Sequence, residues 1–157
     1  MKLIWLGHGS FRIEIEDQVL LIDPWVNGNP MMPDDRIEDA LNGATQILMT
    51  HGHFDHTDDC VQLSKDTSLP VSGIFELINL LESRGAVAGQ AFNKGGTVAF
   101  GNVSVSMVPA SHSSSMVVDG TARYTGMETG FIIRGEGKTI YFSGDTTIMA
   151  DMSWIGA

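Results

Sequence analysis

The N-terminal segment carries the alternating pattern of β-strands. Apolar runs occupy residues 1–6, 11–15 and 19–22, and apolar and charged side chains alternate within the second run. A period of two residues places the apolar side chains on one face of a strand. The pattern predicts a three-stranded antiparallel meander. It ends at Asp23-Pro24, because proline has no N–H with which to continue a strand ladder.

Short strands and helices alternate through the middle of the chain. The apolar runs at 47–50 and 71–73 predict strands, and the segments 37–41, 55–64 and 75–83 predict helices. The helix over 55–64 has acidic residues in its first turn, where they complement the positive end of the helix dipole.

The second half of the chain is rich in strands. We predict four of them, over 97–100, 103–109, 130–134 and 139–143, and the last two read as a hairpin. The segment 113–126 begins with a polar run and predicts a mobile loop over the functional site.

Length and composition indicate one domain over residues 1–157, since 43% of the residues are apolar. The net charge of −10 argues against a nucleic-acid or anionic membrane surface as partner. It leaves a small-molecule substrate, a metal ion or another protein. No stretch approaches the roughly 18 apolar residues of a membrane span. A lone Cys60 excludes an internal disulfide and favours a reduced thiol in the cytoplasm.

Three of the five histidines fall within the segment 50–56, which reads THGHFDH. His51 and His53 are two residues apart at the end of a predicted strand, so both side chains can project to the same side. Asp55 and His56 follow at the turn into a predicted helix. Four ligands from one loop do not comfortably surround a single tetrahedral ion, but they can be divided between two. Nitrogen and oxygen donors suit Zn²⁺, with Mn²⁺ or Fe as alternatives.

A two-metal site needs further ligands at other strand ends. His112 follows the predicted strand 103–109 and can be the third ligand of the ion held by the first two histidines of the cluster. Asp145 follows the last predicted strand and can bridge both ions through its carboxylate. The neighbouring Gly144 permits close backbone approach, and Thr146 is expected to cap a helix that begins after it.

Five short motifs stand at predicted strand ends and turns: LGHGSF at 6–11, LIDP at 21–24, THGHFDH at 50–56, ASH at 110–112 and SGDT at 143–146. Together they resemble the metallo-β-lactamase superfamily, and in particular its branch of metal-dependent hydrolases related to the ascorbate-6-phosphate lactonase. The resemblance implies an α/β (α+β) fold, namely the αββα sandwich of that superfamily.

The resemblance also implies two zinc ions with six ligands, namely His51, His53 and His112 on one ion, Asp55 and His56 on the other, and Asp145 as the bridge. By the same likeness, Asp23 orients a ligand imidazole through its other N–H, the alternative being a plain turn residue. His8 either lines the pocket and acts on substrate or hydrogen-bonds a backbone carbonyl as a structural residue. The structural interpretation is favoured.

Such a centre predicts a metal-dependent hydrolase. Two ions lower the pKa of a shared water enough to give hydroxide near neutral pH. That hydroxide attacks an ester, lactone, amide or phosphodiester, while Asp55 or Asp145 accepts the proton and returns it to the leaving group. One alternative is a catalytically inactive metal-binding or interaction module, and a less favoured one is an iron redox protein with the same ligands.

The family pattern is incomplete at the C-terminal end of this sequence. No histidine follows His112, whereas the family contributes one more to the second ion from a later strand. We therefore expect a truncated member whose last strands are missing and whose second metal site is unfinished. An open sheet edge or apolar face predicts self-association of the isolated chain, such as a homo-oligomer.

Overall fold

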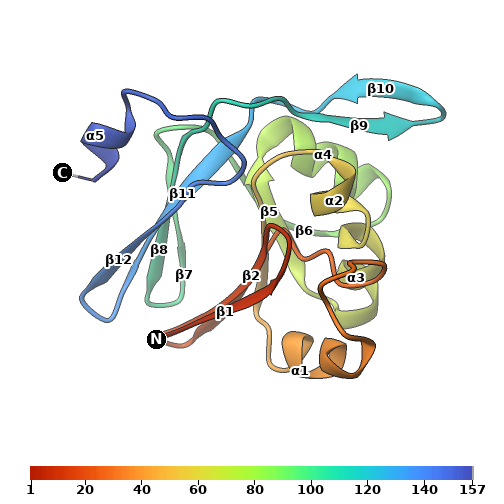
Figure 1. Cartoon of the computed structure of the whole chain (residues 1–157), viewed down its shortest axis with the longest axis horizontal. Helices are drawn as coiled ribbons and strands as arrows, with labels where there is room; N and C mark the ends of the chain where they lie inside the picture. The colour runs from red at the N-terminus through yellow and green to blue at the C-terminus, as the bar shows by residue number, and fades with distance from the viewer. Residues whose placement is uncertain (157) are drawn as a thin grey trace.

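Two β-sheets lie face to face, with helices on the outer face of one of them (Figure 1). The computed structural model describes residues 1–156. The first sheet consists of β1 (Lys2–Gly7), β2 (Ser10–Ile15), β3 (Gln18–Ile22), β4 (Gln46–Met49), β5 (Pro70–Ile74) and β6 (Val87–Phe92).

The meander predicted from the alternating pattern is confirmed, because β1, β2 and β3 pair antiparallel in sequence order. From β3 to β6 the strands run parallel. Parallel neighbours need a crossover, and helices supply it on one face of the sheet. These elements are the 3₁₀ turn η1 (Asp34–Arg36), α1 (Ile37–Leu41), α2 (Phe54–Thr57), α3 (Cys60–Thr67) and α4 (Phe75–Ser83).

The second sheet is antiparallel and has the strand order β12–β11–β8–β7. The predicted hairpin at its edge is confirmed, since the two residues between its strands, Glu136 and Gly137, have φ of 52° and 65°. Positive φ at both central residues is the geometry of the two-residue turn that matches strand twist. The strands are β7 (Thr97–Phe100), β8 (Val103–Pro109), β11 (Thr129–Gly135) and β12 (Lys138–Phe142).

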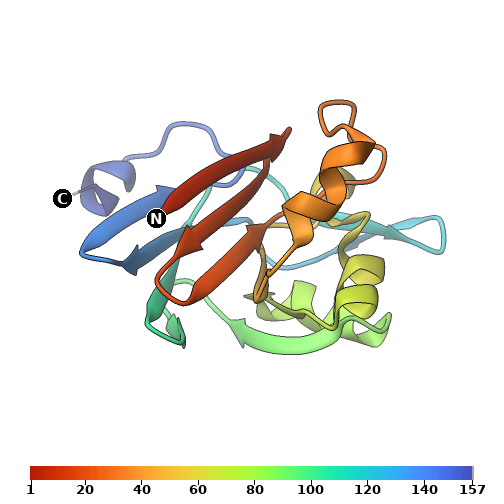
Figure 2. The ribbon, with the colours of Figure 1, turned by 90° about the horizontal axis from the view of Figure 1, so that it is seen from below.

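Aromatic contacts join the two sheets across the core. Phe11 of β2 meets Phe142 of β12 with ring centroids 5.5 Å apart, and Phe92 of β6 stacks on Phe131 of β11 at 6.3 Å. Figure 2 shows the N-terminal meander facing strands β11 and β12. The ends of strands from both sheets therefore meet along one rim of the sandwich, and that rim carries the predicted ligands.

The single helix expected over 55–64 is wrong. The chain forms α2, passes through Asp58-Asp59, and then forms α3. The carboxylate of Asp59 accepts hydrogen bonds from the backbone N–H groups of Val26 and Asn27, both at 2.6 Å. The break therefore holds the loop after β3 against the helices.

The mobile loop expected over 113–126 is also wrong. This segment contains a two-stranded hairpin of β9 (Ser115–Val118) and β10 (Thr121–Tyr124), joined by Asp119-Gly120. Strand β6 was not predicted either. It is an edge strand whose side chains are mostly exposed, so it has no alternating apolar signal.

The helix expected directly after Thr146 begins later, as α5 (Met152–Ile155). Thr146 does not cap it. Its hydroxyl instead accepts a hydrogen bond from the backbone N–H of Ser111, at 2.9 Å. This contact joins the loops after β8 and after β12, which carry the predicted ligands His112 and Asp145.

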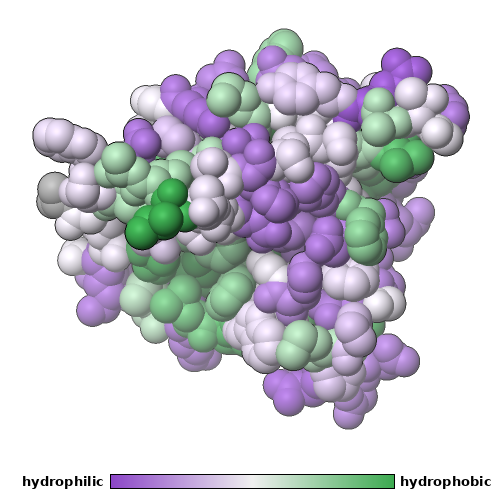
Figure 3. All heavy atoms as spheres, turned by 45° about the horizontal axis from the view of Figure 1, so that its top comes forward, coloured by the Kyte–Doolittle hydropathy of each residue, from purple (hydrophilic) through white to green (hydrophobic). Residues whose placement is uncertain are grey.

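An apolar cleft of about 350 Å³ lies between the open ends of the sheets, lined in part by Leu3, Ile140 and Phe142. Among residues 1–156, β12 pairs only with β11, and β1 pairs only with β2. Figure 3 shows hydrophobic side chains on the side that carries β12 and α5, beside a hydrophilic centre. Within the described part of the chain, no helix has the length and apolar character needed to cross a membrane.

Candidate metal centre

All five histidines of the chain converge on one rim of the sandwich. The segment after β4 contributes three of them, the loop after β8 contributes His112, and the turn between β1 and β2 contributes His8. Asp145 arrives from the loop after β12. The structure therefore brings together every residue that the sequence selected as a candidate ligand, along with Asp23 and His8.

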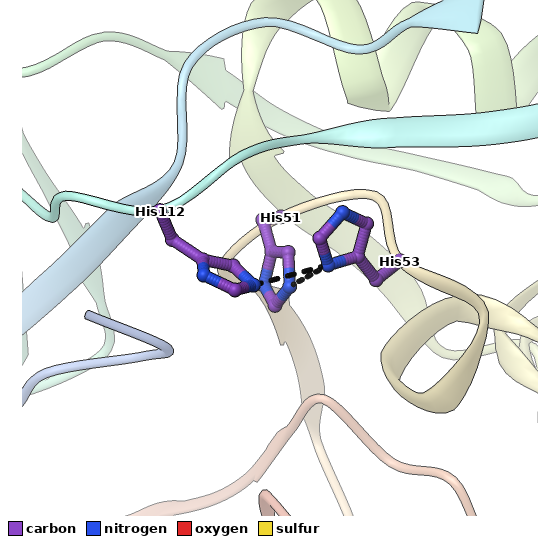
Figure 4. A group of neighbouring side chains, drawn as sticks. All are labelled: His51, His53 and His112. Atoms are coloured by element: carbon purple, nitrogen blue, oxygen red, sulfur yellow. Dashed lines mark hydrogen bonds between the residues drawn. The ribbon is translucent and has the colours of Figure 1, made fainter. Parts of the chain in front are cut away.

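The first group consists of His51, His53 and His112, whose rings point toward one another (Figure 4). Nδ1 of His53 lies 3.1 Å from Nε2 of His51 and 3.2 Å from Nε2 of His112. Three nitrogens on one tetrahedral Zn²⁺ ion at 2.0–2.1 Å stand about 3.3 Å apart, so the spacing suits a shared cation.

These contacts cannot all be hydrogen bonds. A ring nitrogen carries either one hydrogen or one lone pair in the ring plane, so Nδ1 of His53 can serve only one of its two neighbours. A cation in the middle removes the conflict, since all three nitrogens can then present lone pairs. The donor set thus fits a metal ion better than it fits a hydrogen-bonded cluster.

The second group consists of His8, Asp55 and His56, with one ligand atom of each lying within 4.8 Å of the others. Nε2 of His8 is 2.7 Å from a carboxylate oxygen of Asp55. Among the described residues, the His8 ring makes no hydrogen bond to a backbone carbonyl, and its role stays a prediction. Nε2 of His56 is buried and has no hydrogen-bond partner in residues 1–156.

Asp145 lies between the two groups. Its carboxylate oxygens are 3.6 Å from Nε2 of His56 and 3.8 Å from Nε2 of His112. Gly144 makes this approach possible: it has φ of 61°, and a Cβ there would come within 2.5 Å of the Thr129 carbonyl oxygen. Any other residue would displace the loop that carries the aspartate.

Asp23 is fully buried behind both groups and controls the tautomer of one imidazole in each. Its carboxylate lies 2.9 Å from Nδ1 of His56, which leaves Nε2 of that ring facing the site. It also accepts the hydroxyl proton of Thr50, whose oxygen is 3.0 Å from Nδ1 of His51. The Thr50 oxygen then accepts from His51, so Nε2 of His51 presents its lone pair.

Burial and charge set the protonation of the two inner histidines. Burial lowers the pKa of His51 to about 4, which keeps the ring neutral and able to bind metal at neutral pH. Burial alone would lower the pKa of His56 as well. The hydrogen bond and charge of Asp23, aided by Asp145 and Asp55, instead raise it to about 8.

Neighbouring groups also shift the pKa values of the candidate ligands His53 and Asp55. Burial, followed by the charge of His112, lowers the pKa of His53. Burial would raise the pKa of Asp55, but His56 and the hydrogen bond from His8 hold it below its ordinary value. The carboxylate is therefore ionised and available as a ligand throughout the neutral range.

Three residues that contact the candidate ligands were not identified from the sequence. The hydroxyl of Ser113 lies 3.2 Å from Nε2 of His53, Glu128 accepts the backbone N–H of His112, and Thr50 relays the charge of Asp23. Ser113 and Thr50 adjoin ligands in the sequence, which is a weak signal. Glu128 has none, because only the fold brings it to the loop after β8.

Comparison with known proteins identifies the fold and the family. Residues 18–157 match the family model described as beta-lactamase superfamily domain. A protein of Cereibacter sphaeroides named as a metal-dependent hydrolase is 56% identical over 156 residues, which cover 99% of this chain and 68% of that protein.

Solved structures with the same fold are also found. Igni18, a metallo hydrolase from the hyperthermophilic archaeon Ignicoccus hospitalis, is 28% identical with a TM-score of 0.80. The match covers 98% of this chain and 64% of that one. CmlA, a diiron beta-hydroxylase from Streptomyces venezuelae, is 21% identical over 96% of this chain and 30% of its own, with a TM-score of 0.74. This last likeness shows the fold alone.

The chain thus spans roughly two thirds of the relatives it matches, at 68% of the curated protein and 64% of the archaeal structure. The relation to the ascorbate-6-phosphate lactonase and the truncation expected from the sequence stay predictions. By the family model and the sequence identity, the chain belongs to the beta-lactamase superfamily domain family, among its metal-dependent hydrolases.

Proposed function

We propose that this rim is a dinuclear zinc centre that hydrolyses a small molecule. The observation that supports it most is Nε2 of His56, which is buried, has no partner among the described residues, and lies 3.6 Å from Asp145. A buried polar atom without a partner is costly unless something binds it. Together with the conflicting contacts of His53, it favours two cation positions that share Asp145.

The ligands in this proposal follow the two groups and the residue between them, namely His51, His53 and His112 for the first ion, Asp55 and His56 for the second, and Asp145 for both. The mixture of imidazole and carboxylate suits Zn²⁺. When bound, a pair of ions supplies an acidified water and positive charge for the oxygen that becomes negative during hydrolysis.

Two carboxylates, those of Asp55 and Asp145, can transfer the proton of the attacking water. Asp145 has a side chain 41% exposed and lines both the apolar cleft and an open pocket beside His112, so it faces solvent and substrate. Asp55 is less exposed and is held ionised by its histidine neighbours. Either aspartate can accept a proton from water and return it to the leaving group.

The substrate class proposed is a small ester, lactone, amide or phosphodiester. The cleft beside His56 offers an apolar wall for a substrate body, with Phe11 and Phe142 among its lining residues. A net charge of −10 disfavours long polyanions such as nucleic acids. We further propose a cytoplasmic location, which the buried free thiol of Cys60 supports.

Metal analysis combined with turnover tests the proposal. The purified chain is expected to hold close to two equivalents of zinc and to hydrolyse at least one of p-nitrophenyl acetate, a simple lactone and bis(p-nitrophenyl) phosphate. His51→Ala should lose metal and turnover but keep its fold. Unchanged metal content in this variant would refute the ligand assignment.

Other results of the metal analysis would support the alternative functions. One equivalent of metal without turnover would support an inactive metal-binding module. Iron with a visible chromophore would support a redox centre, the chemistry named for CmlA, which shares the fold.

A further inference from the structure

We propose that His8 is a third protein ligand of the second metal ion, beside Asp55 and His56. This inference rests on the dinuclear centre proposed above. It draws the turn between β1 and β2 into the coordination sphere, whereas the predicted ligands all come from the later strand ends.

Distance is the first support. Nε2 of His8 is 2.7 Å from a carboxylate oxygen of Asp55, and one ligand atom from each of His8, Asp55 and His56 falls within a common 4.8 Å. The rings of His8 and His56 have centroids 5.7 Å apart at 67°. An imidazole, a carboxylate and a second imidazole at this spacing form the donor set of a typical three-ligand zinc position.

The turn is built to hold the ring there. Nε1 of Trp5 donates to the carbonyl oxygen of His8 at 2.8 Å, and the His8 ring packs edge-on against Trp25 at 5.6 Å. These contacts fix the backbone and one face of the ring. The nitrogen next to Asp55 is thereby aimed at the second group.

The neighbouring glycine brings the turn close to the buried ligand. A Cβ on Gly9 would lie 2.7 Å from Cε1 of His56. Real side chains do not tolerate that distance, so glycine is what lets the turn pack directly on the His56 ring. The approach of His8 to the second group depends on this packing.

The backbone of the turn is compatible with this placement. His8 has φ of 50°, in the left-handed region where asparagine, aspartate and histidine are enriched among residues other than glycine. It is the first residue of the two-residue turn between Gly7 and Ser10, as Glu136 is in the turn between β11 and β12, so the turn itself accounts for the angle. The turn thus fixes the backbone from which the His8 side chain extends.

The test replaces His8 with residues that suit the same backbone. Asparagine and glycine both accept a left-handed conformation, so His8→Asn and His8→Gly should leave the unfolding temperature of the metal-free chain unchanged or raised. Ser68→Asn is the matched control. It sits at another left-handed, exposed position at the end of α3, away from the centre.

Zinc affinities are measured by chelator competition, and visible spectra are recorded with Co²⁺ in place of zinc. We expect both His8 variants to bind the second ion about 100-fold more weakly or worse, with the first ion unaffected, since even residues behind a metal ligand change affinity 10–100-fold. The Co²⁺ bands of the second position should shift. The Ser68→Asn control should match the wild type in every respect.

Several results would overturn the inference. An unchanged affinity for the second ion would exclude His8 as a ligand while leaving the dinuclear centre intact. A weaker second ion with unshifted Co²⁺ bands would make His8 a positioning residue that acts through Asp55. A wild-type chain that binds fewer than two ions would instead refute the proposed function itself, and the ligand role of His8 with it.

Discussion

At the scale of single residues, one buried carboxylate contacts both of the proposed metal positions through their histidines. Asp23 accepts the proton of His56 directly and reaches His51 through Thr50. It thereby selects the tautomer that leaves each Nε2 free. A ligand set of correct composition would bind poorly if these rings presented N–H groups instead of lone pairs.

Asp23→Asn tests this role. The asparagine amide is nearly the same shape but must aim its NH₂ at Thr50 or at Nδ1 of His56, which puts two donors together. We expect zinc binding to weaken 10–100-fold with little loss of fold. Chelator competition measures the affinity, and Asp39→Asn on the exposed side of α1 is the control. Equal affinities for both variants would show that Asp23 is only a turn residue.

At the scale of elements, the division between α2 and α3 stabilises the loop that follows Asp23. The two adjacent aspartates at the division differ in their contacts: Asp59 accepts three hydrogen bonds from Val26 and Asn27, whereas Asp58 is exposed. The pair therefore offers a matched comparison within one turn of chain.

Asp59→Ala should lower the free energy of unfolding by about 1–3 kcal/mol, because it leaves the partly buried backbone N–H of Val26 without its acceptor and removes the two exposed bonds of Asn27. Asp58→Ala should change it by less than about 0.5 kcal/mol. Urea unfolding followed by circular dichroism measures both. Similar losses in the two variants would mean that general helix electrostatics, and not the loop contact, explains the break.

The same elements show how far sequence patterns reach. The meander and α4 were predictable because half-buried strands and amphipathic helices have apolar residues at regular intervals along the sequence. The β9–β10 hairpin carried a usable signal in Asp119-Gly120, a typical two-residue turn. The break at Asp59 carried none, since its cause lies in backbone groups some thirty residues earlier.

Some residues of the candidate site were likewise predictable from the sequence, and others were not. His112 and Asp145 could be proposed from the sequence because the ligands of a metal centre usually lie where neighbouring strands end, and in the structure their side chains are 3.8 Å apart. The contacts of Glu128 and of His8 depend on how loops from opposite sheets meet. The spacing of residues along the sequence does not show which loops of the two sheets lie together.

At the scale of the whole molecule, the open side of the sandwich is the main physical liability. The outer edges of β1 and β12 are unpaired within residues 1–156, and Leu3 is 54% exposed at the apolar cleft between them. Unpaired strand edges beside apolar surface promote association. That the chain is a single domain over 1–157 stays a prediction at this scale.

Sedimentation velocity tests the expected self-association. The isolated chain should sediment faster as its concentration rises, and Leu3→Lys should shift it toward the monomer by placing a charge in the cleft. Val117→Lys, on the exposed hairpin strand β9, should have no effect. A wild-type chain that is monomeric at every concentration would count against the exposed cleft as an association surface.

The central claim is that one rim of this sandwich holds two metal ions, and anomalous scattering tests it most directly. A crystal of the zinc-loaded chain, measured on both sides of the zinc absorption edge, should show two peaks about 3.5–4 Å apart. One peak is expected about 2.0–2.1 Å from Nε2 of His51 and the other at the same distance from Nε2 of His56, with Asp145 between them. A single peak, or peaks away from these nitrogens, would contradict the account.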